Sequence, residues 1–183
     1  MHGHPTTSRP SAKDVVVQTN AIYHALKQDA SAHTRKRTLQ TLHTSHDAEL
    51  HTMINAFERG SYSAPHMHWI DTASGATIKK GESFLAVEGA GRIVLFNDAG
   101  IVDRIVPMDA NEHTMVWIPA GAWHTVVATS PYFIVFENKT GPWNEGEDKC
   151  FHPQFPKEGE SQGAVFVRAW ESLPVAPSFT PLH

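Results

Sequence analysis

The sequence His66-Met67-His68 is the local pattern best suited to binding a metal ion. On a β-strand, residues i and i+2 point to the same face with their Cβ atoms close together, so both imidazoles could hold one ion while Met67 faces away. The chain contains 13 histidines, however, so a chance pair of this kind is not rare. An exposed or structural pair fits the same spacing, and further ligands are needed to decide.

The cysteine content limits the kind of metal site that the chain can build. Cys150 is the only cysteine among 183 residues, so it cannot form an internal disulfide. A single thiolate also excludes zinc sites made from several cysteines, so imidazole and carboxylate must hold any ion. The length predicts one domain, and the absence of a disulfide framework fits a reducing compartment.

Charge and hydropathy argue against two classes of partner. The formal net charge is −4, and residues 35–37 form only a short basic patch, whereas nucleic acids and anionic membranes need a concentrated positive field. Residues 1–12 lack the apolar stretch of a secretory signal. The longest apolar run, residues 132–136, is far shorter than the roughly 20 residues that cross a bilayer. The sequence predicts a cytoplasmic protein whose partner is a small molecule.

The pattern of apolar residues predicts a mainly β fold behind a helical start. Apolar positions recur at helical spacing from Asp14 to Ala32, so we expect one or two short helices, with Asp14 as a possible N-cap. After Arg37, short β-branched and aromatic segments alternate with turns, which favours an antiparallel sandwich or barrel. Residues 164–170 are the last predicted strand. The predicted division is a loose N-terminus (1–12), a helical extension packed on the barrel (13–50), the barrel (51–172) and a peripheral tail (173–183).

Residues on either side of the histidine pair complete a known pattern. They are Gly60 six positions before His66, Glu82 seven positions before Gly89, and the block Pro119-x-Gly121-x-x-His124. They resemble the two motifs of the cupin superfamily, Gly-x5-His-x-His-x(3 to 4)-Glu-x6-Gly and Gly-x5-Pro-x-Gly-x2-His-x3-Asn. The resemblance implies an all-β cupin barrel, a double-stranded β-helix or jelly roll. It also implies that one divalent transition metal per chain is bound by His66, His68, Glu82 and His124.

The chain departs from the cupin pattern in the first motif. Thirteen residues, 69–81, separate His68 from Glu82 where the family has three or four, so we expect an inserted loop or hairpin at the barrel mouth. Asp71 then becomes a rival carboxylate ligand. Glu82 is preferred because its distance to Gly89 keeps the second half of the motif intact. In the second motif, His113 and Ala128 replace the family's glycine and asparagine.

A narrower resemblance extends from about Arg35 to Gly159. Its segments are Arg35-x-Arg37, Leu42-His43, Gly60-Ser61-Tyr62, Pro65-His66-x-His68, residues 119–125, residues 136–143 and Asp148-Lys149-x-Phe151. They are similar to the WbuC family of cupin fold metalloproteins. That family implies a metal-bearing cupin with helices ahead of the barrel, often associated with bacterial surface-polysaccharide gene clusters.

Three imidazoles and one carboxylate give a ligand set of net charge −1, which suits a divalent ion of borderline hardness such as Fe, Mn, Ni, Zn or Cu. An ion with open positions could activate oxygen or act as a Lewis acid during isomerisation or hydrolysis. The sequence favours an enzyme acting on a small molecule, with carbohydrate-related compounds as one class. The alternatives are a non-catalytic module that binds or senses a sugar or acid, and a purely structural metal. Strand edges and aromatic residues make a homodimer plausible.

Five further residues are candidates for the site. Arg35 and Arg37 could grip a substrate phosphate or carboxylate, or instead pair with an acidic residue of the chain. The WbuC resemblance adds His43 and Lys139 as substrate-binding candidates. Tyr62 could transfer a proton near the metal, as Glu82 could, although a tyrosine at such a position is more often part of the packing.

Overall fold

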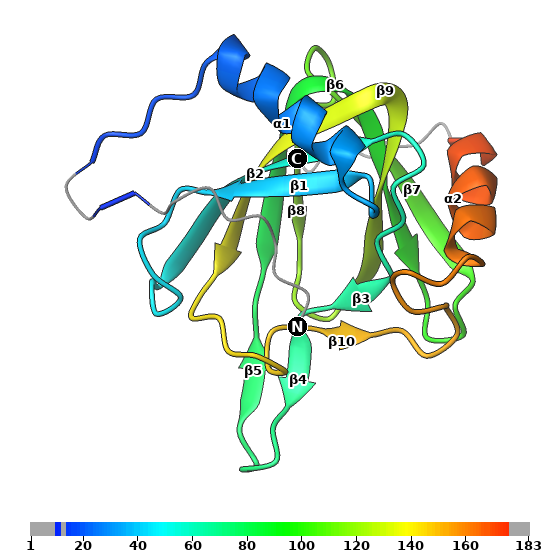
Figure 1. The fold of residues 1–183 in the computed structure, drawn as a ribbon. Helices are drawn as coiled ribbons and strands as arrows, with labels where there is room; N and C mark the ends of the chain where they lie inside the picture. Colours follow the sequence, from blue (N-terminus) through cyan, green and yellow to red (C-terminus); the bar gives the residue numbers. More distant parts are fainter. Residues whose placement is uncertain (1–9, 12–13, 176–183) are drawn as a thin grey trace.

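The computed structural model describes residues 10–11 and 14–175, and most of its regular structure is antiparallel β-sheet (Figure 1). The predictions for residues 1–12 and for the tail fall largely outside the described residues. In chain order the elements are α1 (Asn20–Ala32), β1 (Arg37–Thr41), β2 (Leu50–Glu58), β3 (His66–Met67), β4 (Trp69–Asp71), β5 (Thr77–Lys79), β6 (Glu82–Phe96), β7 (Val102–Asp109), β8 (Met115–Ile118), β9 (Trp123–Thr140), β10 (Cys150–Phe151) and α2 (Gly163–Ser172).

Two long strands, β6 and β9, organise the sheet. They pair with each other over most of their length, and β9 also pairs with β2 and, at His124, with β3. The strand order is β1-β2-β9-β3-β10, and β6 pairs with β9 outside this path and also with β7 and β8. Strands β4 and β5 form a separate hairpin that projects from the lower end (Figure 1). This curled antiparallel sheet is a jelly roll, which confirms the predicted all-β fold class.

A glycine lets β6 change direction between its two halves. The pairing of β6 with β9 shifts register between Ala86 and Glu88 and again between Gly89 and Gly91. Gly89 has a φ of 78°, and a Cβ there would lie 2.1 Å from the carbonyl oxygen of Tyr132. No other residue type fits such a close approach with positive φ. The bend divides β6 into two halves. Glu82, the first residue of β6, lies in one half, and the segment that pairs with β9 at His124 lies in the other.

The two helices cover different parts of the barrel. The buried residues Leu26 and Ala30 of α1 pack on Ile54 and Ala56 of β2, and Figure 1 shows α1 lying across β1 and β2. The side chain of Thr19 accepts a hydrogen bond from the Ile22 amide and so forms the N-cap in place of the predicted Asp14. The extension 13–50 is therefore only partly helical, since it also contains β1.

The prediction of a strand at residues 164–170 is wrong, because this segment lies in helix α2. Its buried residues are Gly163, Val167 and Trp170, which recur at intervals of four and three residues and so share one face of a helix. That face packs on the second core cluster, against Val94 and Trp123. The tertiary contact outweighs the strand preference of the valines.

Candidate metal centre

Three strands bring His66, His68, Glu82 and His124 together. His66 of β3 is the register partner of His124 of β9. His68 follows β3 directly, and its backbone is held on both sides: its amide donates to the carbonyl of Ala120, and its carbonyl accepts from the amide of Lys80. Glu82 opens β6. The insertion 69–81 forms the β4–β5 hairpin, so its two ends meet and Glu82 returns to the histidines.

The four side chains converge on one small volume. Each offers one ligand atom, and these four atoms all lie within 4.8 Å of one another. All four residues are buried. Uncompensated burial of several titratable groups is costly, so such a cluster needs a bound ion or an internal network of hydrogen bonds to offset it.

The hydrogen bonds behind the histidines fix their tautomers. The Nδ1 atoms of His66, His68 and His124 lie 3.0, 2.6 and 2.9 Å from the carbonyl oxygens of Ala64, Asp148 and Ala122 respectively. A carbonyl oxygen only accepts, so each Nδ1 carries the proton. In the neutral ring each Nε2 then presents a lone pair. Backbone carbonyls that orient ligating imidazoles in this way are typical of metal centres.

On the side where the four ligand atoms converge, two buried atoms need a hydrogen-bond partner or a cation. Glu82 Oε1 lies 2.5 Å from His124 Nε2 and 3.4 Å from His68 Nε2. Yet neither Glu82 Oε1 nor His124 Nε2 has a hydrogen bond of acceptable geometry within the described residues. Two lone pairs at this separation repel each other unless a proton or a cation lies between them. The residues present therefore fit a bound cation.

The pKa shifts describe the same electrostatic balance. Burial lowers the pKa of His66 well below its usual value. Burial alone would raise the pKa of Glu82, but His124 and His68 lower it well below the usual value. Burial would lower the pKa of His124, and the Glu82 carboxylate reverses that effect and raises it. The carboxylate is thus the charge around which the imidazoles are arranged, as a cation-binding site requires.

Three of the four residues predicted to bind substrate are already paired with carboxylates, and together with their partners they form a charged wall: Arg35, Arg37, Lys80, Lys139, Asp148 and Glu158. Arg35 and Arg37 share the carboxylate of Glu158 at 3.1 and 2.6 Å. Lys139 donates to Asp148 at 2.7 Å, and the ammonium of Lys80 reaches the other oxygen of the same carboxylate at 3.0 Å.

Three other candidates lie outside the cluster. The His43 ring stacks on His51, with a centroid distance of 4.1 Å, and its Nδ1 lies 3.0 Å from the carbonyl oxygen of Thr52. The Tyr62 hydroxyl donates to the carbonyl of Pro156 at 2.7 Å, and burial raises its pKa. Asp71 is exposed on the hairpin, where its carboxylate accepts from Thr77.

The sequence prediction missed several groups beside the cluster. Asp148 and Lys80 form part of the wall, and the carboxylate of Glu137 accepts a hydrogen bond of 2.7 Å from Asn55 in the buried interior. Burial, followed by the charge of Glu82, raises the pKa of Glu137. Alternation along β9 places Glu137 and Lys139 on one face, a signal that could have identified both together.

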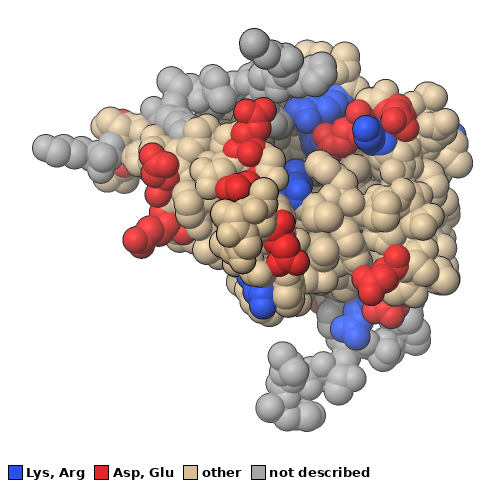
Figure 2. Space-filling view, turned by 90° about the horizontal axis from the view of Figure 1, so that it is seen from below, with Lys and Arg blue, Asp and Glu red and all other residues tan. Residues whose placement is uncertain are grey.

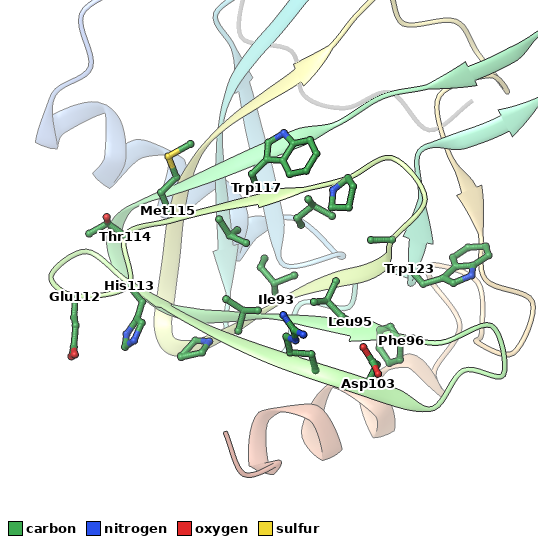
Figure 3. Close-up of a pocket in the computed structure, with 17 residues that line it drawn as sticks. Ile93, Leu95, Phe96, Asp103, Glu112, His113, Thr114, Met115, Trp117 and Trp123 are labelled. Carbon is green, nitrogen blue, oxygen red and sulfur yellow. The ribbon is translucent and has the colours of Figure 1, made fainter. Parts of the chain in front are cut away.

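The structure also contains an apolar cavity beside β8. It has a volume of about 760 Å³ and opens between β8 and the β6–β7 pair, where Figure 3 shows Trp117 and Met115 on one side and Ile93 and Leu95 on the other. Its lining is mostly apolar and contains none of the four ligand residues. Volume alone therefore does not make this cavity the chemical site.

The surface shows mixed charge where Figure 2 displays it. Basic side chains on this lower face are scattered among acidic ones and form no single continuous patch. Among the described residues, none of the helices has both the length and the apolar character needed to cross a membrane.

Comparison with known proteins finds one matching family model and several similar structures. A family model described as a domain of unknown function, DUF6016, matches residues 18–108. No curated protein matches the chain. The capsular polysaccharide assembling protein CapF from Staphylococcus aureus is similar in structure, with a TM-score of 0.48 and 19% identity over 62% of this chain and 29% of CapF. The chain thus spans less than a third of CapF.

Two shorter structures are also similar. KdgF from Halomonas sp. has a TM-score of 0.42 and 18% identity, over 60% of this chain and 81% of KdgF. Rru_A2000 from Rhodospirillum rubrum, described as a cupin-2 domain, has a TM-score of 0.47 and 13% identity, over 72% of this chain and 78% of its own. The buried cluster of three histidines and one glutamate fits a metal-binding site.

Proposed function

We propose that this protein is a metal-dependent enzyme that binds one divalent transition ion through His66, His68, Glu82 and His124 and acts on a small polar molecule. The observation that carries the proposal is the convergence of four buried ligand atoms within 4.8 Å, with each Nδ1 held by a backbone carbonyl. A purely structural polar cluster would be satisfied from within, and this one leaves Glu82 Oε1 and His124 Nε2 without hydrogen bonds inside the described residues.

The chain's own residues would bind and orient the small molecule. A bound divalent ion supplies Lewis acidity, which polarises a carbonyl or hydroxyl oxygen of the substrate. The backbone carbonyls of Ala64, Ala122 and Asp148 keep the imidazoles oriented. The buried Asn55–Glu137 pair offers hydrogen-bonding groups for substrate hydroxyls. This arrangement supports isomerisation of a polyhydroxylated compound, and the WbuC resemblance supports a carbohydrate-related one.

Elemental analysis of protein purified without chelator tests the metal site. We expect about one transition ion per chain in the wild type, and loss of the ion in His66→Ala and His124→Ala with the fold retained. Glu82→Gln should lower metal affinity by more than about tenfold, since it removes the charged ligand. Asp71→Asn is the matched control and should keep full metal content. Wild-type protein with no bound ion would exclude the proposal.

Turnover assays separate the enzyme from its alternatives. An enzyme converts a carbohydrate-related substrate only when metal-loaded, and oxygen uptake in the same assay would indicate oxygenation instead of isomerisation. A binding or sensing module would give a thermal shift with sugars or acids at any metal loading, with no turnover. A structural metal would make the chain unfold on chelation, because the binding free energy would then be folding free energy. The homodimer and the cytoplasmic location stay predictions.

A further inference from the structure

Lys149 directly precedes β10, the strand that pairs with β3. Cys150 is the register partner of Met67, and Phe151 is the partner of His66. Continuing this antiparallel register by one residue places Lys149 opposite His68. Directly opposed residues share a face of a sheet, and so do residues i and i+2. Lys149 and Phe151 therefore lie on the same face as the two histidines, which is the face turned to the metal centre.

Side-chain contacts agree with this placement. The Lys149 ammonium lies 5.4 Å from the centroid of the Phe151 ring, and that ring lies 6.2 Å from the ring of His66. The ammonium thus lies beside the half-exposed Phe151 ring, at the edge of the cluster.

Lys149 has no carboxylate partner within the part of the chain that the structure describes. It forms no ion pair or hydrogen bond there, and its ammonium lies near the ring of Phe151. The nearby carboxylates are occupied, because Glu158 is shared by two guanidinium groups and Asp148 by two ammonium groups. Cations outnumber carboxylates in the wall, and burial lowers the pKa of Lys149. An anion beside Lys149 would offset that cost.

We propose that Lys149 binds the carboxylate of a small organic acid whose other oxygen atoms reach the metal centre. The inference rests on the proposed function and specifies its substrate class. A carboxylate suits this position better than a phosphate. A phosphate group carries about 1.5 to 2 negative charges at pH 7 and would need a second cation, and both guanidinium groups of the wall are already engaged by Glu158. A single ammonium group provides one compact positive charge.

Isothermal titration of the metal-loaded protein with two matched probes tests this assignment. D-gluconate and D-glucitol share a polyhydroxylated carbon chain and differ at the carboxylate. We expect gluconate to bind the wild type more tightly than glucitol. Lys149→Met should weaken gluconate binding by about tenfold or more while glucitol binding stays the same, since a hydrogen bond to a charged group is lost. Lys149→Arg should retain much of the preference.

Lys157→Met is the control, because it removes the same charge from an exposed side chain of the same segment. It should bind gluconate like the wild type. Equal gluconate affinity in wild type and Lys149→Met overturns the assignment, as does wild-type protein that binds inorganic phosphate but not gluconate. Metal content is measured on every variant. A metal-free wild type would count against the proposed function, whereas full metal content with unchanged gluconate binding would count against the role of Lys149 alone.

Discussion

The ligand cluster and the charged wall are both buried and polar, yet they satisfy their polar groups in different ways. In the wall, each carboxylate contacts two cations, as Asp148 does with Lys80 and Lys139. In the cluster, hydrogen bonds hold only the backs of the imidazoles, and Glu82 Oε1 and His124 Nε2 have none within the described residues. The wall can therefore stabilise the fold without a ligand, while the cluster is arranged to bind a cation.

One residue connects the two regions. The carbonyl oxygen of Asp148 accepts from Nδ1 of His68 at 2.6 Å, and the carboxylate of the same residue holds the two lysines. The charged wall thus fixes the backbone that orients a ligand. A substitution in the wall should act mainly on stability, and one in the cluster should act mainly on metal content.

The largest expected effect comes from breaking the wall at its centre. Asp148→Asn keeps the size of the side chain and leaves two buried ammonium groups without a counter-charge. We expect a loss of about 3 to 5 kcal/mol in the free energy of unfolding at neutral pH, measured by denaturant titration. The exposed control Asp71→Asn should change it by no more than about 0.5 kcal/mol. Similar stability of the two variants would show that the wall contributes little to the fold.

The fold was more predictable from the sequence than the site. The alternation of strands and turns and the cupin motifs predicted the jelly roll, because both depend on local patterns. The segment 164–170 was misassigned since its valines favour strands and its helical face is defined only by contact with the barrel. In the site, Lys149 appears in the sequence only within the Asp148-Lys149-x-Phe151 segment of the WbuC resemblance, with no role assigned to it. Its position depends on the pairing of β10 with β3, which joins segments more than 80 residues apart.

A smaller effect is expected from removing the charge of Glu158, the carboxylate that pairs with the two guanidinium groups. The pH dependence of this effect should show whether the guanidinium groups form a structural ion pair or a substrate site. Burial on its own would raise the pKa of Glu158, but Arg37, Lys149 and Arg35 lower it below its usual value. Since the folded pKa is depressed, the stabilisation is present above the unfolded value of about 4.3 and is lost as the pH falls through the folded pKa. Glu158→Gln should cost about 1 to 3 kcal/mol at pH 7.

The test is the difference in the free energy of unfolding between wild type and Glu158→Gln. It is measured by denaturant titration at a series of pH values from 7 downwards. The difference should shrink below about pH 4.3, as the wild-type carboxylate gains its proton. Glu160→Gln is a suitable control, because Glu160 is an exposed carboxylate of the same loop. A difference that stayed constant with pH would mean that Glu158 acts through packing and not through its charge.

The smallest effect concerns Tyr62, where the sequence left catalysis and packing open. Its hydroxyl donates to Pro156, and its ring stacks near Trp170 at a centroid distance of 6.1 Å. Tyr62→Phe removes one hydrogen bond and should lower the free energy of unfolding by about 1 kcal/mol, with metal content unchanged. Metal-dependent turnover should also stay the same. A fall in turnover of about 100-fold at full metal content would instead place Tyr62 in proton transfer, because general acid–base catalysis contributes effects of that size.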